Sequence, residues 1–63
     1  MNDEERKNFG KRVLKVLEDD LKHYQYLYKV TNHSKKKQHH LDNIKIIEEV
    51  IQDIKIDYGL DAR

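Results

Sequence analysis

Two series of apolar residues, one in each half of the chain, constrain the fold most strongly. Each series advances by alternating steps of three and four residues, which is the spacing of a heptad seam along an α-helix. If the chain folds back on itself near Ser34, the two series fall opposite one another, and the residue numbers in every layer add up to 68. Two seams that register across one short turn predict an antiparallel, coiled-coil-like hairpin of two helices. The predicted layers are Gly10/Tyr58, Leu14/Ile54, Leu17/Ile51, Leu21/Ile47, Tyr24/Ile44 and Tyr28/His40.

The limits of the first helix follow from its capping residues. Asn2 is followed three residues later by Glu5, a spacing that resembles a capping box. We therefore predict a first helix from about residue 3 to residue 30. Gly10 lies inside this helix, where glycine costs about 1 kcal/mol relative to alanine. Its place opposite Tyr58 suggests that the missing side chain leaves room for the phenol ring.

The second helix is expected after a turn at residues 31–34, which consist of Thr-Asn-His-Ser. Ser34 or Thr31 is the expected N-cap, because a hydroxyl oxygen can accept a hydrogen bond from a free N–H group of the first turn. The helix should then run from about 35 to 58. Gly59 follows it in the position where a residue in the left-handed conformation commonly ends a helix.

Most apolar residues outside the seam fall on one side of the predicted hairpin. They occupy the g and c positions of the heptads, and the g edges of two antiparallel helices lie on the same side. A single hairpin would leave this side in water, which monomeric proteins usually avoid. A two-fold dimer that forms a four-helix bundle is the simplest way to bury it, and packing on a different protein is the alternative. The predicted dimer interface consists of Phe9, Val13, Val16, Leu27, Val30, Ile46, Val50 and Leu60.

The sequence shows no motif for catalysis or for cofactor binding. It has no HExxH sequence, no glycine-rich phosphate loop and no cysteine, and its single serine is Ser34. Asp20 and His23 form a carboxylate-x-x-His pair of the kind that bundle metal sites use. At that height the second helix offers Asn43, Ile46 and Val50 and no inward-facing carboxylate to complete a metal site, so a polar break that fixes the dimer register is the simpler interpretation. We predict a protein that is not an enzyme and binds no cofactor.

Lysines gather where the predicted hairpin turns. The net charge of the chain is only +1, but residues 29–45 contain five lysines and one aspartate. Three of these lysines would lie in the first turn of the second helix, at the positive end of its dipole, where each costs about 0.3–1 kcal/mol. Lysines and free helix N–H groups together can hold an anion, and a lysine cluster that only increases solubility is the alternative. The candidate anion- or partner-binding residues are Tyr26, Lys29, Lys35, Lys36, Lys37 and His39.

Two classes of function fit these features. The first is a small protein-interaction or regulatory module that acts as a hairpin dimer. The second is a regulator that binds RNA or DNA through paired basic tips; a known class of RNA-binding four-helix dimers shares this architecture but no residue motif with the chain. Leu41-Asp42 matches only the end of the Ser-Gln-x-Leu-Asp motif of small hairpin phosphatases, which excludes that family. The low net charge favours protein interaction.

The composition also indicates where such a chain would work. It contains no cysteine to form a disulfide, which favours a cytoplasmic location. Its longest apolar run is Tyr26-Leu27-Tyr28, too short for a signal peptide or a membrane-spanning helix. We therefore expect no membrane partner.

Overall fold

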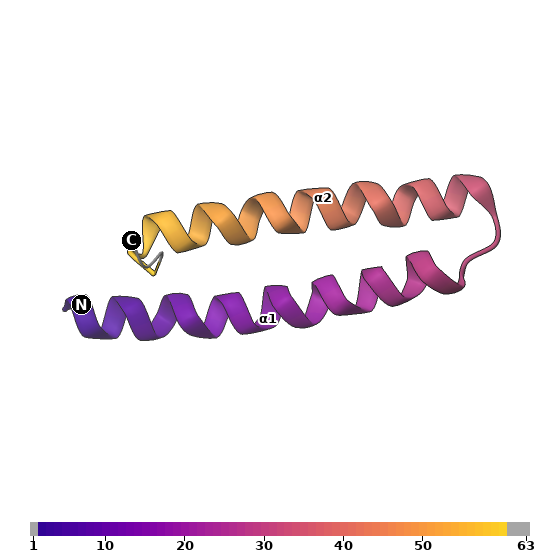
Figure 1. Cartoon of the computed structure of the whole chain (residues 1–63). Helices are drawn as coiled ribbons and strands as arrows, with labels where there is room; N and C mark the ends of the chain where they lie inside the picture. Colours follow the sequence, from indigo (N-terminus) through magenta and orange to yellow (C-terminus); the bar gives the residue numbers. More distant parts are fainter. Residues whose placement is uncertain (1, 61–63) are drawn as a thin grey trace.

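The structure, a computed structural model that describes residues 2–60, consists of two helices joined by a short turn (Figure 1). Helix α1 spans Asp3–Val30 and helix α2 spans Ser34–Asp57. The helices run antiparallel, so the two chain ends lie together at one end of the molecule and the turn lies at the other (Figure 1). The predicted all-α helical hairpin is confirmed. Met1 and residues 61–63 of the predicted domain lie outside the described residues.

The start of α1 agrees with the predicted cap. The Asn2 side-chain oxygen Oδ1 accepts a hydrogen bond of 2.8 Å from the backbone N–H of Glu5. Asp3, Glu4 and Glu5 fill the first turn, where their negative charges face the positive end of the helix dipole. The sequence signal and the local geometry coincide here because both depend on neighbouring residues alone.

The prediction that Ser34 or Thr31 caps the second helix is wrong. Ser34 is already the first residue of α2, and the N-cap is His33, whose side chain makes no capping hydrogen bond. Three residues are enough to reverse the chain, so α2 begins one residue earlier than expected and its serine is already in helical conformation. Thr31 instead ends α1, where its N–H donates to the Leu27 carbonyl at 2.9 Å.

The seam between the helices is the core of the molecule. Every residue of the six predicted layers is buried or half-buried. Leu14 and Ile44 keep 8% of their surface exposed and Ile51 keeps 9%. Even the best-covered side chains among the described residues thus keep some contact with water, as expected for a core that is only two helices wide.

Gly10 and Tyr58 form the last layer at the open end, as predicted. A Cβ atom placed on Gly10 would lie 2.8 Å from both Cβ and Cγ of Tyr58 and 3.0 Å from Cδ1 of Leu60. Carbon atoms do not approach this closely without a shift of one helix. The absence of a side chain at Gly10 is therefore what lets the two helices approach here.

The end of α2 is a Schellman motif. Gly59 has a φ of 64°, which a residue without a side chain adopts at little cost. The Gly59 N–H donates to the Ile56 carbonyl at 3.2 Å, and the Leu60 N–H donates to the Lys55 carbonyl at 2.8 Å. This turn brings Leu60 back against α1 beside Gly10.

The hairpin is long and thin. It measures 47 × 18 × 16 Å, and its radius of gyration is 14.3 Å. A compact domain of this length has a radius of gyration of about 11 Å. Because the molecule is only one pair of helices thick, side chains outside the seam have nothing within the chain to pack against.

Candidate functional site

The predicted dimer interface forms one surface, which we call the apolar face. It consists of Phe9, Val13, Val16, Leu27, Val30, Ile46, Val50 and Leu60. Val13, Leu27 and Leu60 are half-buried. The other members are exposed, with 61% of the surface of Val16 and 58% of that of Ile46 open to solvent. The hairpin therefore leaves large apolar side chains uncovered on this face.

On α1, two polar residues interrupt the apolar face near its middle. Asp20 and His23 occupy the g and c positions of α1 there, and both are exposed. Leu21 forms a seam layer with Ile47, so this polar interruption lies at the height of Ile46 and Val50 on α2. The apolar surface thus passes from α1 to α2 at the middle of the hairpin and returns to α1 near the turn.

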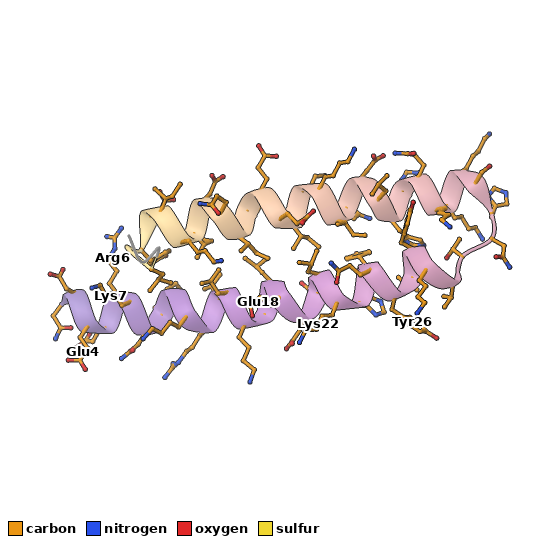
Figure 2. All side chains as sticks on the ribbon, in the orientation of Figure 1. Glu4, Arg6, Lys7, Glu18, Lys22 and Tyr26 are labelled. Atoms are coloured by element: carbon orange, nitrogen blue, oxygen red, sulfur yellow. The ribbon has the colours of Figure 1, made fainter. Side chains whose placement is uncertain are left out.

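At the open end, Arg6 joins the two helices, which the sequence analysis did not predict. Its Nη2 atom donates a hydrogen bond of 2.8 Å to the backbone carbonyl of Asp57. Its guanidinium carbon lies 5.1 Å from the centre of the Tyr58 ring, a cation–π distance. Figure 2 shows Arg6 extending from α1 toward the end of α2. The predicted register places Gly10 opposite Tyr58, and Arg6 reaches the ring from one helical turn before Gly10.

The Tyr58 ring also contacts the edge of the apolar face. Its centre lies 5.9 Å from that of Phe9, and the two rings are tilted by 48°. Arg6 and Phe9 therefore approach Tyr58 from α1, and the contact keeps Phe9 at the open end of the apolar face.

The predicted anion-binding residues lie near the turn, and we call them the basic tip. Lys29, Lys35 and Lys36 are exposed, whereas Lys37 is half-buried. The Lys37 ammonium lies 4.7 Å from the centre of the Tyr28 ring. Lys37 thus makes a cation–π contact within the hairpin, and the other lysines are the ones available to a partner. The basic tip comprises Tyr26, Lys29, Lys35, Lys36, Lys37 and His39.

Tyr26 and His39 lie on the outside of the basic tip. Tyr26 keeps 62% of its surface exposed, and Figure 2 shows it on the part of α1 near the turn. His39 lies with Lys35 and Asp42 around a shallow hollow on α2, in which Gln38 donates a 2.9 Å hydrogen bond to the Asp42 carboxylate. The Asp42 carboxylate offsets part of the positive charge of Lys35, so this hollow is not a purely basic surface.

His40 occupies the seam layer next to the turn. Its ring centre lies 6.2 Å from that of Tyr24. The Nδ1 atom is buried and has no hydrogen-bond partner among the described residues. A polar atom without a partner weakens this layer relative to the isoleucine layers further along.

The structure brings no larger set of metal-ligating groups together at Asp20 and His23. Within residues 2–60, no three or more His, Asp or Glu side chains are grouped in a way that could hold a metal ion. Over the same part of the chain, neither helix has an apolar stretch long enough to cross a membrane.

Comparison of the chain with protein-family models, with characterised proteins and with solved structures gives no match.

Proposed function

We propose that this chain is a non-enzymatic protein-interaction module that forms a homodimer through its apolar face and contacts a further partner through its basic tip. The observation that supports the proposal most strongly is the set of exposed apolar side chains on one side of both helices, among them Val16, Val30 and Ile46. Small helical domains gain stability by burying such surfaces in a bundle. The cysteine-free sequence supports a cytoplasmic location.

The dimensions of the hairpin fit this proposal. A stable interface covers about 800 Å² on each partner, and a face 47 Å long and 18 Å wide provides an area of this order. Two hairpins packed face to face would form a four-helix bundle in which the apolar face becomes a second core layer. A homodimer needs only this chain. A different protein would have to present apolar residues that match those of α1 near both ends of the face and those of α2 at its middle.

A pair of substitutions tests the dimer. Val50→Glu places a charge on the apolar face of each subunit, and an unpaired charge in an apolar interface costs several kcal/mol. We expect the wild-type chain to sediment as a dimer of twice 7.7 kDa, with a melting temperature that rises with concentration. The Val50→Glu variant should sediment as a monomer and lose helicity on dilution.

Ile56→Glu is the matched control. Ile56 is exposed to 61% but lies on the outer side of α2, away from the apolar face. This variant should remain a dimer with nearly unchanged melting. A stably folded wild-type monomer, or equal effects of the two substitutions, would contradict the proposed dimer.

Nucleic-acid binding is a second candidate function, supported by the exposed part of the basic tip. Lys35 and Lys36 stand at the N-terminus of α2, and Tyr26 supplies an exposed aromatic ring nearby. Ammonium groups can contact phosphates and an aromatic ring can stack on a base. We favour an acidic protein surface as the partner, because the whole chain has a net charge of only +1.

A further inference from the structure

The apolar face carries a second heptad series on each helix. On α1 the g and c positions run through Phe9, Val13, Val16, Asp20, His23, Leu27 and Val30, at alternating steps of three and four residues, and the six from Val13 to Val30 form the central part of the series. On α2 they run through Lys36, His39, Asn43, Ile46, Val50, Asp53, Asp57 and Leu60. Such a series can pair with a copy of itself in the way that the seam residues pair within the hairpin.

Two antiparallel copies of the α1 series place compatible side chains opposite one another. If α1 packs antiparallel on α1 of a second copy, Val13 falls opposite the partner's Val30, and Val16 falls opposite the partner's Leu27. In the same register Asp20 falls opposite the partner's His23, and the two-fold axis repeats this contact. Every apolar residue of the central part then meets an apolar residue, and each carboxylate meets an imidazole.

The series on α2 shows the same property. With α2 antiparallel to its copy, Ile46 falls opposite the partner's Val50, and Asn43 falls opposite the partner's Asp53. His39 near the basic tip then falls opposite the partner's Asp57 near the open end. In these layers each acidic side chain faces an amide or an imidazole and no carboxylate faces another, while at the ends Lys36 falls opposite the partner's Leu60.

A single two-fold axis serves both helices. The midpoint of the α1 pairing lies between Leu21 and Lys22, and the midpoint of the α2 pairing lies at Glu48. Leu21 and Ile47 form one seam layer, so the two midpoints lie at nearly the same height on the hairpin. Neither series alone requires the two midpoints to lie at the same height. Their agreement follows from the seam register between α1 and α2.

The parallel arrangement lacks these matches. In a face-to-face dimer with both turns at the same end, α1 of one subunit would face α2 of the other at equal height. Asp20 would then lie between the partner's Ile46 and the partner's Val50. An acidic group would be buried without a partner, which costs several kcal/mol.

We infer that two copies of this chain pack antiparallel, with α1 on α1 and α2 on α2, and that Asp20 of each subunit contacts His23 of the partner subunit near the two-fold axis. This inference rests on the proposed dimer and adds its arrangement. It also places the two basic tips at opposite ends of the bundle, so each tip acts as a separate binding site.

Two charge variants test this arrangement. In Asp20→Lys homodimers, lysine faces histidine, and in His23→Asp homodimers, aspartate faces aspartate. Each variant alone should dimerise at least about tenfold more weakly than the wild type, because both Asp20–His23 contacts are lost and, in His23→Asp, carboxylate faces carboxylate twice. Mixed together, the two variants should form a heterodimer of near wild-type affinity, since lysine then faces aspartate and the natural His–Asp pair is kept. Sedimentation and native mass spectrometry measure the species.

Asp19→Lys and Lys22→Asp are the matched controls, because these neighbouring exposed residues lie outside the g and c series. They should dimerise as the wild type does, alone and mixed. A second measurement uses the absence of natural cysteine. On oxidation, Val16→Cys mixed with Leu27→Cys should form the mixed disulfide, whereas the parallel arrangement predicts cross-linking of Val16→Cys with Asp53→Cys.

The outcomes separate the two claims. A dimeric wild type whose charge variants do not rescue one another, or whose cysteines cross-link in the parallel pattern, overturns the antiparallel arrangement alone. A monomeric wild type overturns the proposed dimer as well.

Discussion

Single residues of this protein have effects that depend on the residue across the seam. Gly10 illustrates this best, because in an isolated helix a glycine is a defect and here it is a space for Tyr58. Ile51 and Ile56 make the same point, since the same side chain is 9% exposed in the seam and 61% exposed outside it. A substitution must therefore be assessed by its layer as well as by its helix propensity.

Gly10→Ala should destabilise the hairpin although it raises helix propensity. The gain in propensity is about 1 kcal/mol. The new Cβ would lie 2.8 Å from two carbons of Tyr58 close to the backbone, and overpacking of this kind costs about 1–3 kcal/mol. We expect a net loss of stability in urea denaturation followed by circular dichroism. Asn8→Ala, on the exposed surface of the same helix, is the control and should not destabilise the protein. A more stable Gly10→Ala variant would mean that the helices lie further apart than described.

At the scale of the helices, the two N-termini differ in their capping and in the charge of their first turn. Helix α1 begins with a capping asparagine and three acidic residues. Helix α2 begins with His33, which forms no side-chain cap, and has no acidic residue in its first turn. The lysines of this turn meet the positive end of the helix dipole, so the start of α2 is the weaker of the two.

A cap and a charge change should therefore strengthen α2. His33→Asp supplies a side-chain acceptor and a negative charge, and should stabilise the hairpin by about 1 kcal/mol.

Replacing both Lys35 and Lys36 by Ala should raise stability by about 0.3–1 kcal/mol for each lysine. Lys37→Ala should instead lower it by about 0.5–1 kcal/mol, because the contact with Tyr28 is lost. Thermal melting at several salt concentrations measures all three.

His33→Ala is the control for the cap and should change little, since the histidine side chain forms no capping bond. If the Lys35/Lys36 double substitution and Lys37→Ala changed the stability in the same direction, Lys37 would not differ from its neighbours as the structure indicates.

At the scale of the whole molecule, charge is separated along the hairpin. The region around the turn is basic, while α2 beyond it carries Glu48, Glu49, Asp53 and Asp57 against Lys55. A partner that approaches the basic tip therefore meets a local positive field on a protein that is nearly neutral overall. This local field can steer an acidic partner without the broad basic surface of most nucleic-acid binders.

Salt dependence distinguishes the two candidate partners. With Lys29, Lys35 and Lys36 exposed, a single-stranded RNA probe should bind with a slope of log affinity against log salt of about −2. We expect this binding to be weak and to be lost when Lys35 and Lys36 are both replaced by Gln, measured by fluorescence anisotropy. Lys11→Gln with Lys15→Gln is the control with an equal change of charge at the other end of α1. Tight binding with a much steeper slope would favour nucleic acid over an acidic protein as the partner.

The sequence alone determined the two helices, the seam register and the caps at Asn2 and Gly59, because heptad spacing and capping depend on residues close together in the chain. It also identified Gly10 as a space for Tyr58, since the register follows from a single turn. Only the tertiary structure decided that His33 stands at the N-cap position of α2 without a capping hydrogen bond, that Arg6 reaches the Asp57 carbonyl, and that Lys37 lies on Tyr28 while Lys35 and Lys36 stay exposed. These features depend on where the turn places one helix end against the other and on which rotamer a long side chain adopts. The spacing of residues along the chain predicts neither the helix placement at the turn nor the rotamer.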